Sequence, residues 1–87
     1  MPYRVLIKPP AEKALRRMAK PLRRRIAQAI DSLARNPRPE GARKLVGSED
    51  AYRIRVGDYP VVYVVAERVL VVYVVRIGHR REVYRGL

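Results

Sequence analysis

The sequence predicts a small α+β domain in which two N-terminal helices pack on an antiparallel sheet of about four strands. Two changes in periodicity lead to this prediction. Apolar residues recur with helical spacing between residues 11 and 33, and they alternate or form continuous β-branched runs between residues 51 and 77. A chain of 87 residues fits one domain, spanning 1–87. The expected order of elements is β-α-α-β-β-β, followed by a short C-terminal tail.

The N-terminal half is expected to form a strand and then a helical hairpin. Residues 3–8, YRVLIK, alternate and are followed by two prolines, which is typical of a strand and its end. From Ala11 to Met18 the apolar residues share one helical face, and basic residues occupy the other. Pro21 is expected to open a second helix, because proline is tolerated at the first helical position. Asn36, in the segment RNPRP, is expected to end that helix with a left-handed cap.

A hairpin with a proline in its second strand is expected to follow. In AYRIRV, residues 51–56, strand periodicity places Arg53 and Arg55 on the face opposite the apolar side chains. If the following Gly-Asp pair forms a two-residue turn, Arg55 faces Pro60 across the hairpin, and position 60 shares the face of both arginines. In that register the nitrogen of residue 60 does not bond back to the first strand, so proline is tolerated there.

Two almost continuous β-branched runs, residues 60–66 and 69–77, predict the central strands of the sheet. Runs of this kind are typical of strands that are covered on both faces, or covered on one face and shielded on the other by a partner. Only Glu67 and Arg68 separate the two runs, so we expect a tight antiparallel hairpin. A short strand is expected around residues 44–46, within the turn-rich connection that follows the second helix.

The charge of the chain restricts its partners. Lysine and arginine together number 20 against 8 acidic residues, which gives a formal net charge of +12. Such a charge attracts polyanions, namely nucleic acid, an anionic membrane surface or an acidic protein. No apolar run reaches the roughly 18 residues of a membrane helix, and the N-terminus lacks the apolar region of a secretory signal. With no cysteine for disulfides, we expect a cytoplasmic protein that does not use a membrane.

The C-terminal segment GHRREVYR concentrates side chains that suit RNA chemistry. Cleavage of RNA through its own 2′-hydroxyl needs a proton acceptor, a proton donor and cations for the charge that develops on the phosphate. The segment contains all three kinds of group, in His79, Arg80, Arg81, Tyr84 and Arg85. The alternative from the residues alone is a basic tail on the sheet, with Arg53 and Arg55 on a solvated strand face. No metal or other cofactor is expected, because there is a single histidine and the carboxylates are not clustered.

Two longer stretches, KLVGSEDAYRIRVGDYPVVYVV and VVYVVRIGHRREVYR, resemble the RelE/ParE superfamily of bacterial and archaeal toxin–antitoxin modules, on the RelE side. The resemblance covers nearly the whole chain, from YRVLIKPPAEKALRRM to the final tyrosine motif. It implies two N-terminal helices on an antiparallel sheet, in agreement with the order predicted from periodicity. It also implies a ribosome-dependent endoribonuclease that cuts mRNA in the A site. A cognate antitoxin, expected to be acidic, would wrap around the toxin in a hetero-oligomer.

The resemblance assigns roles to residues that the chemistry had already suggested. The family's two basic strand residues fall on Arg53 and Arg55, and its C-terminal arginine and tyrosine fall on Arg80 and Tyr84. The basic residue of the family's KL pair falls on Lys44. The catalytic candidates are therefore Arg53, Arg55, His79, Arg80 and Tyr84. The expected RNA contacts are Lys44, Arg53, Arg81 and Arg85.

The sequence departs from the family pattern at two places. Well-studied members carry lysines where Arg53 and Arg55 stand, and arginine essentially never loses its proton in proteins. The two arginines are therefore expected to stabilise the phosphate. The general base is expected to be Tyr84, His79 or a ribosomal group. Members with this motif typically have an arginine where Pro60 stands. Loss of one transition-state donor costs about 100- to 1,000-fold in rate, so attenuated cleavage is expected.

Two other functions fit the same sequence. A ParE-like toxin would share the fold, bind DNA gyrase and need no arginine–tyrosine cluster. A catalytically inactive basic domain that binds RNA or the antitoxin would account for Pro60. The histidine, arginines and tyrosine of the tail favour the RelE-type enzyme over the ParE-like toxin.

Overall fold

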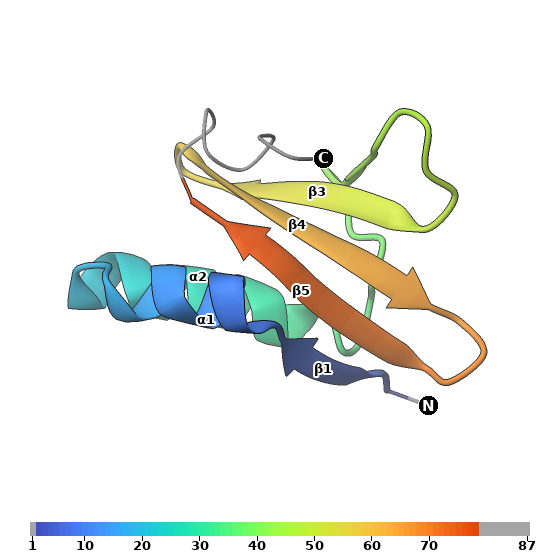
Figure 1. Cartoon of the computed structure of the whole chain (residues 1–87), viewed down its shortest axis with the longest axis horizontal. Helices are drawn as coiled ribbons and strands as arrows, with labels where there is room; N and C mark the ends of the chain where they lie inside the picture. The colour runs from blue at the N-terminus through green and yellow to red at the C-terminus, as the bar shows by residue number, and fades with distance from the viewer. Residues whose placement is uncertain (1, 79–87) are drawn as a thin grey trace.

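The computed structural model describes residues 2–78, which form a five-stranded sheet with two helices on one of its faces (Figure 1). The elements in chain order are β1 (Arg4–Ile7), α1 (Pro9–Arg16), α2 (Lys20–Ser32), β2 (Arg43–Lys44), β3 (Ala51–Val56), β4 (Tyr59–Ala66) and β5 (Val71–Ile77). The predicted α+β class, with both helices on one side of the sheet, is confirmed. Within residues 2–78, neither helix has the length and apolar character needed to span a membrane.

The sheet is mixed rather than antiparallel, and it has five strands rather than about four. Its strand order is β1-β5-β4-β3-β2. β1 runs parallel to β5, whereas the other neighbouring strands are antiparallel. The expected short strand is present as the two-residue β2, which begins one residue earlier than predicted. β1 and β5 lie far apart in sequence, and β1 pairs with the edge of the β3–β4–β5 meander that β2 leaves free. No local pattern encodes that choice.

Both helices begin with proline in their first turn. Pro9 and Pro10 are the first residues of α1, and Pro21 is the second residue of α2. The first turn of a helix has backbone N–H groups without intrahelical partners, so the missing N–H of proline costs little there. The two prolines after the first strand therefore start a helix as well as ending the strand.

The end of α2 differs from the prediction. The helix stops at Ser32, and its next turn tightens through bonds from the Leu33 and Ala34 N–H groups to the carbonyls three residues earlier. Asn36 does not adopt the left-handed conformation. Its side-chain oxygen instead accepts the Arg38 N–H at 3.1 Å, so this asparagine organises the turn after the helix rather than capping it.

The helices and the sheet enclose one apolar core. The core residues from the helices are Ala11, Leu15, Ile26, Ile30 and Leu33, and those from the sheet are Ile54, Val61, Tyr63, Val65, Val72, Val74 and Ile77. We call the opposite face of the sheet, on which neither helix packs, the open face. By the strand register it carries, among others, Leu6, Arg43, Arg53, Arg55, Pro60, Val62, Val64, Tyr73 and Arg76. Pro60 and Val62 are buried on that face too, so the prediction that β4 is covered on both sides is confirmed.

The β4–β5 connection is longer than predicted. β4 ends at Ala66 and β5 begins at Val71, so four residues form the turn instead of two. Leu70 closes this turn with φ of +53°, in the left-handed region that β-sheet residues avoid. Val69 and Leu70 are apolar and were assigned to the strand for that reason, but both are exposed.

Candidate functional site

The β3–β4 hairpin brings Arg53, Arg55 and Pro60 together on the open face. Gly57 has φ of +60°, which suits the first position of a two-residue type II′ turn. The register that follows places Arg55 directly opposite Pro60 and Arg53 opposite Val62. Directly opposed residues project from the same side of a sheet. The predicted register of this hairpin is therefore confirmed.

Pro60 fits its strand because the hairpin requires no hydrogen bond from the nitrogen of residue 60. In a two-residue hairpin the pair next to the turn is hydrogen-bonded, and the following pair, here Arg55 with Pro60, is not. The backbone of Pro60 faces β5 instead, where its carbonyl accepts the Gly78 N–H at 3.4 Å. Its ring is fully buried, whereas Arg55 is exposed. Position 60 therefore holds a buried, uncharged ring next to the Arg55 guanidinium.

Besides Arg4 in β1, two further arginines lie on the open face, and they were missed from the sequence. Arg43 in β2 pairs with Arg53, and Arg76 in β5 pairs with Val62. Because Arg53 also pairs with Val62, the three arginines occupy one row across the sheet. A register shift between Val62 and Tyr63 adds one residue on β5 and so determines the face of Arg76. The available signal for Arg76 was a charged residue interrupting an apolar strand.

The positive charge of the open face is not balanced by ion pairs within the described part of the chain. Residues 2–78 contain two ion pairs, Glu12 with Arg16 at 3.6 Å and Glu67 with Arg38. Neither involves the arginines of the open face, of which Arg53 is half-buried and the others exposed, namely Arg4, Arg43, Arg55 and Arg76. A face with several unpaired cations on a chain of net charge +12 attracts polyanions.

The other predicted site residues lie partly outside the described residues. This holds for His79, Arg80, Arg81, Tyr84 and Arg85. The last described residue is Gly78, whose N–H donates to the Pro60 carbonyl. The roles of the five residues stay predictions.

Lys44 lies in β2 next to Arg43 but on the other face. Its partner across the ladder is Tyr52, whose ring packs against the helix-side core. Lys44 is exposed at the edge of the sheet, and its contact with RNA stays a prediction. Between residues 2 and 78, no group of three or more histidine, cysteine, aspartate or glutamate side chains is arranged to hold a metal ion.

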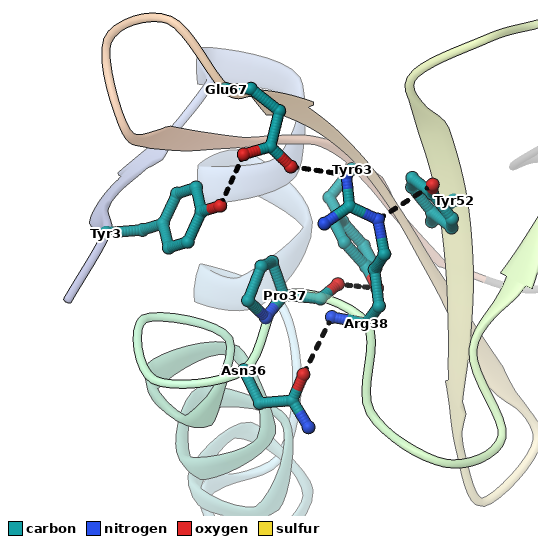
Figure 2. A network of polar contacts seen from close by, with 7 residues as sticks. All are labelled: Tyr3, Asn36, Pro37, Arg38, Tyr52, Tyr63 and Glu67. Atoms are coloured by element: carbon teal, nitrogen blue, oxygen red, sulfur yellow. Dashed lines mark hydrogen bonds and ion pairs between the residues drawn. The ribbon is translucent and has the colours of Figure 1, made fainter. Parts of the chain in front are cut away.

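A polar network centred on Arg38 holds the chain that leads into β2 (Figure 2). Arg38 donates from Nε to the Tyr52 hydroxyl at 2.9 Å and also pairs with the Glu67 carboxylate. The Tyr3 hydroxyl donates to the second oxygen of Glu67 at 2.6 Å. The hydrogen bonds from Tyr3 and from Arg38 hold the pKa of Glu67 below its ordinary value. The network therefore ties the segment before β2 to β1, to β3 and to the turn after β4.

Tyr63 anchors the same segment from inside the core. Its hydroxyl donates to the Pro37 carbonyl at 2.7 Å, and its ring stacks on Tyr52 with centroids 5.9 Å apart (Figure 2). Burial raises the pKa of Tyr63 to about 12, so the hydroxyl keeps its proton at neutral pH. These contacts fix the path of the chain into β2 and thereby the position of Arg43.

A groove of about 400 Å³ lies on the helix side, at the end of the sheet where Pro60 is located. Its apolar lining comes from the helices and from the strand ends, and Arg17 stands among these residues: Ala14, Met18, Ala19, Leu22, Tyr59 and Ile77. An apolar groove that also offers a cation suits an amphipathic partner with acidic residues.

Most of the chain matches the model of a known protein family. Residues 5–84 match the model described as ParE toxin of type II toxin–antitoxin system, parDE. No relative is found among the curated proteins.

The fold is similar to that of solved toxins. A doubly substituted RelE toxin from E. coli in the free state has a TM-score of 0.82 at 30% sequence identity, covering 97% of this chain and 92% of that chain. A chain of the archaeal RelE–RelB complex from Pyrococcus horikoshii OT3 has a TM-score of 0.81 at 35% identity, covering 92% and 97%. A chain of the intact E. coli RelBE toxin–antitoxin complex has a TM-score of 0.78 at 28% identity, covering 88% and 95%.

Proposed function

We propose that this chain, which belongs to the ParE toxin family of type II toxin–antitoxin systems within the RelE/ParE superfamily, is a RelE-type endoribonuclease that cuts mRNA in the ribosomal A site. The observation that supports this most directly is the arginine pair. Arg53 and Arg55 project from one face of β3, and within residues 2–78 neither forms an ion pair. Two structurally similar chains, at 30% and 35% identity, come from a RelE toxin and a RelE–RelB complex.

In the proposed reaction the 2′-hydroxyl of one nucleotide attacks the adjacent phosphorus. A base removes the hydroxyl proton, the bond from phosphorus to the next 5′-oxygen breaks, and an acid protonates that oxygen. The products are a 2′,3′-cyclic phosphate and a 5′-hydroxyl. Arg53 and Arg55 stabilise the charge on the phosphate but cannot serve as the base, since arginine keeps its proton. Tyr84 and His79 are the acid–base candidates, and Arg80 is a third candidate cation.

The uncharged position 60 is expected to weaken this enzyme rather than remove its activity. Pro60 is opposite Arg55, where a donor could have contacted the same phosphate. One missing transition-state donor corresponds to about 100- to 1,000-fold in rate. Cleavage is therefore expected to be slow, with Arg55 carrying the larger share of phosphate stabilisation on this side.

Cleavage on ribosomes tests the proposal. Purified ribosomes are programmed with a defined mRNA, and new 5′ ends are mapped by primer extension. We expect cuts in the A-site codon with the wild type, loss of these cuts with Arg55→Gln, and full cutting with Arg24→Gln. Arg24 is exposed on α2, so its substitution removes the same charge away from the open face.

A negative result with the wild type is followed up with Pro60→Arg. Because Pro60 is buried and lies opposite Arg55, circular dichroism first confirms that this variant folds. Absence of A-site cutting by both the wild type and a folded Pro60→Arg variant would refute the endoribonuclease.

A gyrase-directed toxin is the second candidate function. It is favoured by the matching family model, whose description is that of a ParE toxin. A DNA supercoiling assay distinguishes the two. Inhibition of gyrase at protein concentrations that leave programmed ribosomes uncut would select the ParE-like function.

A non-catalytic domain that binds RNA or an antitoxin is the third, and Pro60 is the observation in its favour. Expression in a bacterial host separates it from a weakened enzyme. Growth arrest that strengthens with Pro60→Arg indicates an enzyme, whereas unaltered growth with both proteins indicates a binder.

The partner that we propose is a cognate acidic antitoxin in a hetero-oligomer. The similar chains from E. coli and Pyrococcus horikoshii OT3 belong to toxin–antitoxin complexes. In this chain, the groove with Met18, Leu22 and Arg17 is suited to an amphipathic helix that carries acidic residues. Leu22→Lys is expected to weaken the complex, as measured by calorimetric titration with the antitoxin, without affecting cleavage.

A further inference from the structure

We propose that the open face carries a binding track for single-stranded RNA, formed by the row Arg43, Arg53 and Arg76 together with the ring of Tyr73. The inference rests on the proposed function, because it identifies groups beyond the Arg53–Arg55 pair that hold the RNA. Arg43, Arg76 and Tyr73 have no role in the reaction described above. Their positions follow from the pairing of β2, β4 and β5.

The row crosses four neighbouring strands. Arg43 pairs with Arg53, Arg53 pairs with Val62, and Val62 pairs with Arg76. With about 4.7–4.9 Å between neighbouring strands, the row spans roughly 14–15 Å. The middle strand, β4, contributes only Val62 and the adjacent Pro60, both uncharged and buried. The exposed guanidinium groups of Arg43 and Arg76 therefore stand on either side of an uncharged strand, where one polyanionic chain can contact both.

The row is costly to the folded protein in the absence of a polyanion. Like charges directly opposite each other destabilise a β-ladder, and Arg43 stands directly opposite Arg53. Arg43 and Arg76 are exposed, and no carboxylate of residues 2–78 forms an ion pair with either of them. An RNA backbone that lies on the open face would relieve this repulsion, because a phosphate there places a negative charge between two guanidinium groups.

The position of Tyr73 favours a single strand over a duplex. Tyr73 pairs with Val64, so its ring lies on the open face in the row next to Arg76. It is half-buried, and the Lys8 ammonium lies 4.8 Å from the ring centroid. An aromatic ring among cations is the combination that binds unpaired nucleotides, with the base on the ring and the phosphates on the cations. The paired bases of a duplex are stacked on each other and are not free to use such a ring.

The test is RNA binding in the absence of ribosomes. Fluorescence anisotropy measures the affinity of the full chain for a labelled 12-nucleotide oligouridine over a series of salt concentrations. The double variant Arg43→Gln/Arg76→Gln is compared with Lys13→Gln/Arg24→Gln, which removes the same charge from exposed helical positions. Circular dichroism verifies that both variants are folded.

Each lost phosphate contact lowers the slope of log affinity against log salt by about 0.7 for a single strand. We therefore expect the slope of the open-face variant to fall by about 1.4. Between about 50 and about 200 mM salt, the wild type then loses roughly sevenfold more affinity than this variant. The helix variant is expected to change the slope by less than half as much. Tyr73→Leu is expected to lower the affinity at least about fivefold.

Several results would overturn the inference. They are an equal effect of the two double variants, equally tight binding of a duplex of the same length, and displacement of the RNA by polyglutamate at equal charge concentration. The last result would instead indicate an acidic protein as the occupant. Failure of the endoribonuclease proposal can be told apart from failure of the RNA track. RNA binding through the row without A-site cutting refutes the endoribonuclease and leaves the track standing. Undiminished cutting by Arg43→Gln/Arg76→Gln together with an unchanged slope refutes the track alone.

Discussion

Replacing Tyr63 by phenylalanine tests how firmly the segment before β2 is fastened to the sheet. The Tyr63 hydroxyl donates to the Pro37 carbonyl at 2.7 Å, and both residues are buried. Phenylalanine keeps the ring and its stacking on Tyr52, so the change removes the hydroxyl alone. The Pro37 carbonyl is then left without its partner in a place that water does not reach. Losing one member of a buried hydrogen bond costs about 1–3 kcal/mol in the free energy of unfolding.

Urea unfolding at pH 7, followed by circular dichroism, measures this cost. Thermal unfolding gives a second measure, because 1 kcal/mol corresponds to roughly 4–8 °C in the unfolding temperature of a domain of this size. Tyr3→Phe is the matched control, because it removes a hydroxyl whose bond to Glu67 is exposed to solvent. We expect the control to cost less than about 1 kcal/mol. If Tyr63→Phe is no more destabilising than Tyr3→Phe, the buried bond does not hold this segment.

The same pair of proteins gives a second, pH-dependent readout. Burial raises the pKa of Tyr63 from 10.0 to about 12 in the folded protein. The stability that the neutral hydroxyl contributes is therefore complete below pH 10 and is lost as the pH rises toward 12. At one pKa unit per 1.36 kcal/mol, the advantage of the wild type over Tyr63→Phe falls by roughly 2–3 kcal/mol across that interval. A constant difference between pH 9 and 12 would contradict the burial of this hydroxyl.

Three further substitutions test other parts of the structure. Arg53→Gln is expected to lower A-site cleavage by about 100- to 1,000-fold with little change in the urea midpoint, and a loss below tenfold would argue against direct phosphate contact. Glu67→Gln removes a carboxylate with a lowered pKa, so its destabilisation is expected above pH 4.5 and should fade as the pH falls below that value in an acid-unfolding series. Gly57→Ala is expected to cost about 1–2 kcal/mol in thermal unfolding. At that site φ is +60° and only the Arg25 guanidinium lies near an added Cβ, at 3.9 Å, so an unchanged unfolding temperature would mean that the turn relaxes freely.

Local patterns were sufficient for most of the elements. The apolar stripe from Ala11 onward predicts the helices, because side chains three and four positions apart share a helical face. The β-branched run in β4 predicts its central place, since only a strand covered on both faces can bury so many apolar side chains. Asn36 was misjudged because its side chain has two uses, as a left-handed cap and as an acceptor for a nearby N–H. In this structure its side-chain oxygen accepts the backbone N–H of Arg38.

The sequence by itself determined that Arg53, Arg55 and position 60 share a face, because strand alternation and a two-residue turn are properties of neighbouring residues. Only the tertiary structure decided that β1 joins β5 in parallel and that β2 completes the other edge. It also decided that Arg43 and Arg76 complete a row with Arg53. The physical reason is the same in each case. Pairing between distant strands depends on which edges remain free and on one extra residue in β5, and neither is encoded in any short stretch of the chain.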